Sequence, residues 1–196
     1  AYPSIYVSGA NSAPTVSAGV LNSGSAITLP ANTTTAITVV ASSTDPDGAG
    51  DLRFATSTLY RSGVSGGAAC TADNLNCYQV ASSSCSFTDS SSTISCTANI
   101  EFFAQATDAS STFPSQNWLA AVTATDSASN TNSSSTASGV ELNTLLAIDV
   151  DPGLIDYGTL TASSTSGATN PTSSVKNAGN ASTTLKIHGT ALTKGS

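Results

Sequence analysis

One loop of the sequence carries carboxylates at a spacing that suits a metal ion. Asp45, Asp47 and Asp51 are interspersed with proline and glycine in the run DPDGAGD. Such a loop can turn several oxygens toward one hard cation, and Ca²⁺ takes about 6–8 oxygen ligands. An EF-hand needs a glutamate at the twelfth loop position, where Thr56 stands, so we reject that motif.

We hypothesise that this loop forms part of a calcium site without EF-hand geometry. It would use Asp45, Asp47 and Asp51 and would borrow Asp108 or Asp126 from another loop. The alternative is an inter-strand turn, in which aspartates accept hydrogen bonds from their own backbone and glycine supplies a positive φ. Calcium is the one cofactor that the sequence suggests.

Groups for acid–base or nucleophilic chemistry are few. Asp149 and Asp151 would share one strand face, where they would hold a cation near a domain junction or stay solvated. His188 is the single histidine, and we expect it on a polar surface. A Ser/His/Asp triad would have to use it, and the sequence contains no G-x-S-x-G elbow. We therefore expect no enzymatic activity.

The four cysteines, Cys70, Cys77, Cys85 and Cys96, fall in one window. Their spacings match neither zinc knuckles nor a redox C-x-x-C, and no histidine lies near enough in sequence to complete a metal set. Disulfides fit better, and they place the chain outside a reducing cytosol. We favour Cys70–Cys77 across a loop and Cys85–Cys96 across a hairpin, since both close short rings; crossed pairings stay open.

Composition excludes several functional classes. The 196 residues include 12 acidic and 5 basic groups, a net charge of −7, and only 9% are charged. This balance offers no footprint for nucleic acid or anionic lipid. No apolar run approaches the roughly 20 residues needed to span a bilayer, so we expect no membrane insertion.

Three N-x-S/T sequons occur in polar, turn-like sequence, at Asn32, Asn132 and Asn180. Together with the serine and threonine runs they make the chain a candidate glycoprotein. The alternative is that these polar groups simply solvate loops.

The elements that must hold these residues are strands, because apolar residues recur with period two. Four strands are indicated by this alternation. Their apolar faces comprise Ile94, Cys96, Ala98, Ile100 and Phe102 in one strand, Trp118, Ala120, Val122 and Ala124 in a second, and Ile37, Val39 and Ala41 in a third. Leu59-Tyr60 lies in the fourth strand. Helix signals are nearly absent. We therefore predict an all-β chain with a β-sandwich over residues 15–143.

A second unit is expected after a boundary near Asn143. Strands are predicted over Leu145–Val150, Ile155–Leu160 and Thr183–Ile187. Residues 144–196 are too few for a sandwich of about 100 residues, so we interpret this unit as an incomplete domain.

The first 14 residues form an extended segment and linker. Ser4, Ile5, Tyr6 and Val7 make a β-prone run, which a Gly/Ala/Asn/Ser/Pro linker separates from the first domain. We expect this run to add a strand to the incomplete domain of a neighbouring subunit. The rival hypothesis is that the missing strands are encoded downstream.

Several segments carry a resemblance to known sequences. DPDGAGDL (45–52), LYRSGV (59–64), CTADNLNCYQV (70–80), NWLAAVTATDSASN (117–130) and GVELNTLLAIDV (139–150) resemble the Ig-like repeats of large secreted or surface proteins of ultra-small, Parcubacteria-like candidate-phyla bacteria. IDYGTL (155–160) and VKNAGNASTTLKIHGTAL (175–192) are similar to the opening strands of a hydin-type Ig-like domain. The resemblance implies two Ig-like domains, the second partial, at the cell surface, and no catalytic residues.

Two functions follow from these expectations. The first is a structural subunit of an extracellular filament or surface layer, whose partner is a second copy of itself. The second is an Ig-like stalk or adhesin module of a larger cell-surface protein, with a surface or glycan ligand that the sequence does not identify. Electron microscopy distinguishes the two functions, because the first predicts ordered fibres and the second predicts dispersed monomers.

Overall fold

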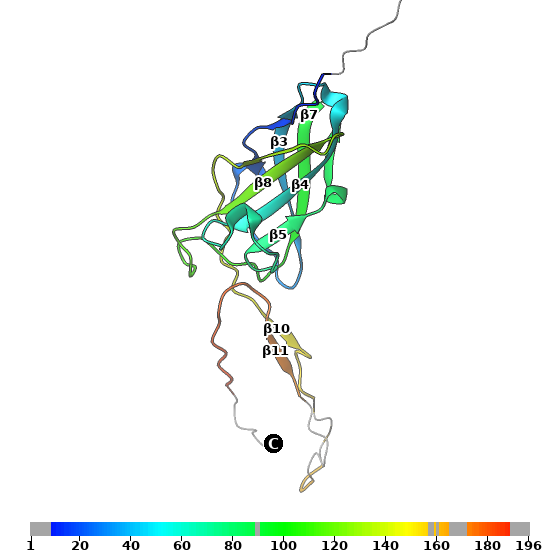
Figure 1. The fold of residues 1–196 in the computed structure, drawn as a ribbon. Coiled ribbons are helices and arrows are strands. Elements are labelled where there is room, and N and C mark those ends of the chain that lie inside the picture. The colour runs from blue at the N-terminus through cyan, green and yellow to red at the C-terminus, as the bar shows by residue number, and fades with distance from the viewer. Residues whose placement is uncertain (1–8, 89–90, 157–158, 160, 165–171, 189–196) are drawn as a thin grey trace, which may run out of the picture.

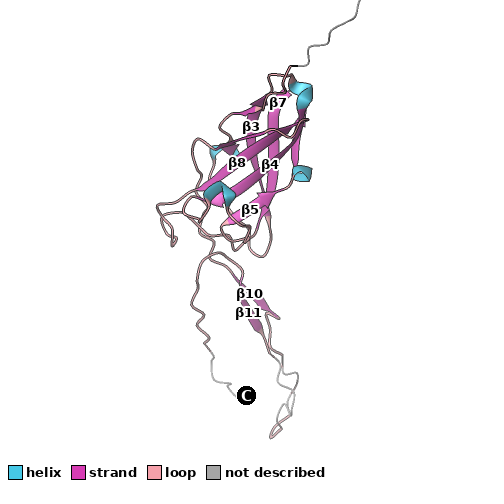
Figure 2. Ribbon diagram, in the orientation of Figure 1, coloured by secondary structure: helices cyan, strands magenta, loops and turns pink. Residues whose placement is uncertain are grey.

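The computed structural model describes residues 9–88, 91–156, 159, 161–164 and 172–188. Regular structure in these ranges is almost entirely strand, with 3-10 turns of three residues each between them (Figure 2). These turns are η1 (Asn22–Gly24), η2 (Ala49–Asp51), η3 (Gly67–Ala69) and η4 (Ser82–Ser84). The all-β prediction is confirmed.

Two antiparallel sheets form a sandwich (Figure 1). The first sheet has the order β1 (Thr15–Val16), β3 (Thr35–Thr44), β7 (Ser91–Ile100) and β6 (Cys85–Thr88), and β2 (Val20–Leu21) also pairs with β3. The second has the order β5 (Cys77–Val80), β4 (Leu52–Arg61), β8 (Trp118–Asp126) and β9 (Thr131–Ser135). The chain crosses between sheets through the loop from β3 to β4, which contains the predicted metal residues.

The alternating residues of both sheets meet in one core. The predicted inner faces of β3, β7 and β8 are buried, and β7 ends at Ile100, so Phe102 lies beyond the strand. Trp118 is fully buried; its ring lies 5.9 Å from that of Tyr78, and its Nε1 donates to Gln105 O. Burial of period-two faces between two sheets is what the sequence pattern predicts.

Both favoured disulfides are confirmed. Cys70–Cys77 closes the loop that leads into β5, and Cys85–Cys96 joins residues directly opposite each other on β6 and β7. The described chain contains no free cysteine. Two disulfides indicate an oxidising, extracellular environment.

A separate hairpin follows the sandwich. β10 (Ile148–Asp151) pairs with β11 (Ser174–Asn177) in a two-stranded sheet beyond one end of the sandwich (Figure 1). The last core residue of the sandwich before the hairpin is Leu142, whose neighbour Asn143 donates its backbone N–H to Ile27 O.

The strand predictions for this second unit need correction. The strand near Leu145–Val150 is present as β10, but its partner, β11, was not among the predicted strands. Thr183–Ile187 forms no strand, because no strand among the described residues lies beside it to pair its alternating backbone groups. Ile155 and Asp156 are also loop, while 157, 158 and 160 lie outside the described residues.

Candidate functional site

Strand pairing brings three aspartates together at one end of the sandwich. Leu52, the first residue of β4, pairs with Asp126, the last residue of β8, so Asp51 comes close to Asp126. Asp45 follows β3 in the other sheet. Carboxylate oxygens of Asp45, Asp51 and Asp126 all lie within 4.8 Å of one another. We call these residues the acidic triad.

The three carboxylates differ in their partners. Asp126, only 2% exposed, accepts hydrogen bonds from the backbone N and Nδ2 of Asn130, at 2.7 and 2.9 Å. Asp51 accepts hydrogen bonds from the Ser127 hydroxyl and from Asn11 Nδ2, which lower its pKa below the ordinary value. Asp45 Oδ1 accepts the Asp47 N–H at 2.8 Å. Asp45 Oδ2 is buried and accepts no hydrogen bond from any described residue.

The loop over residues 45–51 also has the contacts expected of an inter-strand turn. Gly48 adopts φ +112°, a conformation that side chains rarely take, and Asp51 N donates to Gly48 O. These turn contacts bend the loop so that its two ends, Asp45 and Asp51, face Asp126. The turn and a cation site are therefore compatible descriptions of the same segment.

The linker that precedes β1 is held at the acidic triad. Asn11 donates to Asp51 Oδ2 at 2.6 Å and its Oδ1 accepts Asn130 Nδ2 at 2.8 Å. The backbone N of Ser12 donates to Asp47 Oδ2 at 2.7 Å. Asp47 is thus engaged with the linker and is not a member of the triad. Of the two further metal ligands expected from other loops, Asp108 and Asp126, it is Asp126 that lies at this site.

Asp108 lies elsewhere, in the loop between β7 and β8. Thr144 N and Oγ1 donate to its carboxylate at 2.7 and 2.6 Å, and Ser110 adds a third bond. Burial by itself raises the pKa of Asp108, but these hydrogen bonds outweigh it and lower the pKa below its ordinary value. Asp108 therefore holds the segment that leads to the hairpin.

Asn180 makes two side-chain hydrogen bonds at the junction between sandwich and hairpin. Asn180 Oδ1 accepts Leu145 N at 2.7 Å, and its Nδ2 donates to Asn143 O at 3.1 Å. A pocket of about 540 Å³ adjoins it, lined by neutral side chains that include Gln105, Ser111 and Thr144. The side chains that line it include no ionisable group, so the lining offers no acid, base or charged metal ligand.

The remaining candidates fall at scattered places. Asn32 is exposed and donates to Asp149 Oδ2 at 3.0 Å, while the sequon at Asn132 lies exposed on the edge strand β9. Asp149 and Asp151 share one face of β10, as predicted. His188 is exposed. The donor run Ser4–Val7 lies outside the described residues.

Sequence reasoning missed the loop cluster around Arg61. This arginine, at the end of β4, is buried; its Nε donates to Asn76 Oδ1 at 2.8 Å, and its guanidinium lies 3.7 Å from the centroid of Phe113. Burial lowers the pKa of Arg61. A lone arginine in a strand pattern gives no sequence signal for such an environment.

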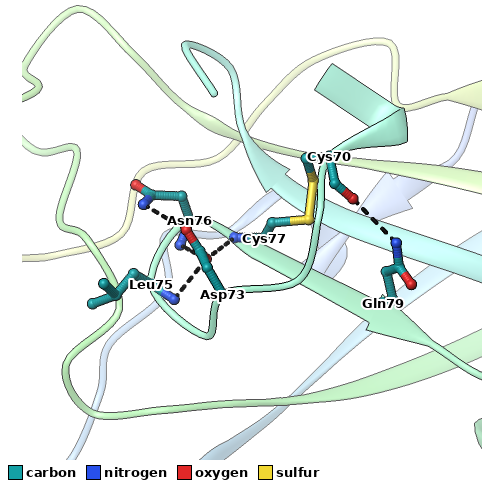
Figure 3. Close-up of a disulfide and its surroundings, with 6 residues drawn as sticks. All are labelled: Cys70, Asp73, Leu75, Asn76, Cys77 and Gln79. Atoms are coloured by element: carbon teal, nitrogen blue, oxygen red, sulfur yellow. Dashed lines mark hydrogen bonds between the residues drawn. A yellow bond between two sulfur atoms is a disulfide. The ribbon is translucent and has the colours of Figure 1, made fainter. Parts of the chain in front are cut away.

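Asp73 organises the disulfide loop (Figure 3). Its Oδ1 accepts the backbone N–H groups of Leu75, Asn76 and Cys77 at 2.7–2.9 Å. Burial raises the pKa of Asp73, but these bonds outweigh it, so the pKa lies below its ordinary value. The contacts of Arg61 and Asp73 therefore have a structural explanation and require no ligand.

The protein is thus a disulfide-bonded, two-sheet β-sandwich with a hairpin attached at one end and the acidic triad at the opposite end (Figure 1). No protein-family model, curated protein or solved structure matches the chain. Among the described residues, no helix has the length and apolar character needed to cross a membrane.

Proposed function

We propose that the protein is a structural, non-catalytic subunit of an extracellular filament or surface layer. Each subunit joins the next when the run Ser4–Val7 of one copy adds a strand to the β10–β11 hairpin of another. The observation that carries the proposal is an exposed apolar face on that hairpin.

The two faces of the hairpin differ sharply in chemistry. Ile148, Val150 and Val175 share one face and are 51%, 41% and 38% exposed. The other face carries Asp149 directly opposite Lys176. A two-stranded hairpin is marginally stable alone, and a third strand with apolar contacts is the usual remedy. The apolar face is therefore suited to receive further β structure.

Ser4–Val7 fits that requirement. Ile5 and Val7 alternate with Ser4 and Tyr6, so an added strand would place two aliphatic side chains on the apolar face while its backbone pairs with an open edge. β10 and β11 each have one neighbouring strand among the described residues, which leaves an outer edge on either side.

The positions of donor and acceptor favour a chain of subunits. Residues 9–14 leave the sandwich at the end that holds the acidic triad, and the hairpin projects from the opposite end (Figure 1). Because the two patches differ and lie at opposite ends, the contact is head-to-tail and propagates into a fibre instead of closing as a dimer.

The test uses three forms of the chain: wild type, a truncation lacking residues 1–10, and Val150→Asp. Wild type should form fibres by electron microscopy, and each altered chain alone should remain a folded monomer. Mixed together, they should form a 1:1 dimer, since only the truncation retains the acceptor and only Val150→Asp retains the donor. Ser4→Asp, on the opposite face of the donor run, is the matched control and should still assemble.

Two results would overturn the proposal. One is unchanged polymerisation of the truncated chain. The other is a wild-type chain that stays monomeric at every concentration, which would favour the second candidate, a stalk or adhesin module of a larger surface protein.

A further inference from the structure

We infer that the acidic triad binds one calcium ion and that this ion fixes the linker to the end of the sandwich. The inference does not depend on subunit assembly. It rests on the convergence of three carboxylates from two segments, the β3–β4 loop and the end of β8, on one buried oxygen without a partner, and on the contacts of the linker.

The spacing of the carboxylates suits a single cation. Their oxygens lie within 4.8 Å of one another. Two oxygens on opposite sides of a Ca²⁺ ion with bonds of about 2.4 Å are about 4.8 Å apart, so one ion can reach all three groups. Among the described residues, the basic group that lowers the pKa of Asp51 by its charge is Arg53, and it is exposed to solvent. Like charges this close repel one another when all three are ionised, and an exposed guanidinium offsets such repulsion only weakly.

One carboxylate oxygen of the triad also lacks a hydrogen-bond partner within the described part of the chain. Asp45 Oδ2 is buried and accepts no hydrogen bond from any described residue. A buried carboxylate oxygen without a donor is costly, and native structures rarely leave one in that state. A cation at the triad would satisfy this oxygen. The other carboxylate contacts, to Asn130, Ser127 and Asn11, hold the ligands in place.

The ion would also affect the linker. Asn11 is hydrogen-bonded both to Asp51 and to Asn130, the partner of Asp126, and Ser12 is bonded to Asp47 of the same loop. Pro14, two residues further on, is fully buried. Neutralising the triad therefore stabilises the loop to which the linker is attached, and calcium should order residues 11 and 12.

Calcium binding to the full chain is measured by titration calorimetry after exhaustive chelation, with Mg²⁺ as the comparison ion. We expect one site per chain, with a dissociation constant at or below about 1 mM. A saturating concentration should raise the melting temperature by about 5 °C. Hydrogen exchange at the Ser12 amide should slow in the same titration.

Asp45→Asn and Asp51→Asn should each weaken binding at least about tenfold, because each removes a charged ligand. Asp73→Asn is the matched control, since Asp73 is a turn carboxylate outside the triad, and it should bind as wild type does. Circular dichroism and intact disulfides check that every variant is folded. No saturable binding up to about 10 mM Ca²⁺, or equal binding by both triad variants and wild type, overturns the inference. So does tighter binding of Mg²⁺ than of Ca²⁺.

Discussion

The sandwich and the hairpin share a sequence pattern but differ in what covers it. In β3, β7 and β8 the alternating apolar residues face a second sheet and are buried. In β10 and β11 the same alternation leaves Ile148, Val150 and Val175 exposed, because the described chain provides no opposing sheet. Period two therefore predicts a strand face, while its burial depends on a second layer.

The two regions also differ in how they are held together. The sandwich has a common core and two disulfides, whereas the hairpin is attached through backbone and asparagine hydrogen bonds at its base. We expect the sandwich to unfold as one cooperative unit and the hairpin to open locally at lower cost.

Replacing a buried apolar residue of the sandwich should destabilise the fold far more than replacing an exposed apolar residue of the hairpin. Trp118→Ala should lower the free energy of unfolding by about 3–5 kcal/mol, because it leaves a cavity between the sheets. Ile148→Ala should change it by less than about 1 kcal/mol in the monomer. Urea denaturation of both variants measures the difference. Similar losses for the two would show that the hairpin belongs to the same cooperative core.

Removing a disulfide should have the next largest effect, confined to the sandwich. Replacing Cys85 and Cys96 together by alanine should cost about 2–3 kcal/mol, since the unfolded chain loses a short closed ring. Hydrogen exchange in β10 should be unchanged. Peptide mapping without reduction of the variant should still recover Cys70 joined to Cys77; a free thiol there would contradict independent disulfides.

A smaller effect should appear only at the hairpin. A Cβ at Gly179 would lie 2.1 Å from Leu145 O, so Gly179→Ala must displace the base of the hairpin. We expect amide exchange at Ala178 and Asn180 to rise at least about tenfold, with the denaturation midpoint of the sandwich nearly unchanged. Gly153→Ala is the control, because its nearest neighbour is 3.9 Å away. An equal response of both variants would contradict the role of Gly179 at the base of the hairpin.

The smallest effect concerns acid stability of the sandwich. The pKa of Asp73 in the folded chain lies below the ordinary value of 3.8, so this carboxylate stabilises the fold above that pH and loses its contribution as pH falls through the folded pKa. Asp73→Asn should flatten the stability profile below about pH 4 by about 0.5 kcal/mol or less. Its stability relative to wild type should not vary above pH 5; a difference that grows there would contradict the argument.

Much of this protein follows from the sequence alone, because the signals are local. Alternation in residues such as Val39, Cys96 and Val122 predicts the buried faces, and short rings predict both disulfides. The carboxylates of the 45–51 loop are likewise visible in sequence, although Asp47 lies outside the triad and contacts the linker.

Relations between segments far apart in the chain, in contrast, are determined by tertiary contacts. The β4–β8 pairing, with Leu52 opposite Asp126, selects Asp126 over Asp108 as the third acid of the triad. The partner of β10 is Ser174–Asn177, and Thr183–Ile187, with the same alternation, forms no strand. The physical reason is that alternation fixes which side of a strand is apolar but carries no information about which distant strand satisfies its backbone hydrogen bonds.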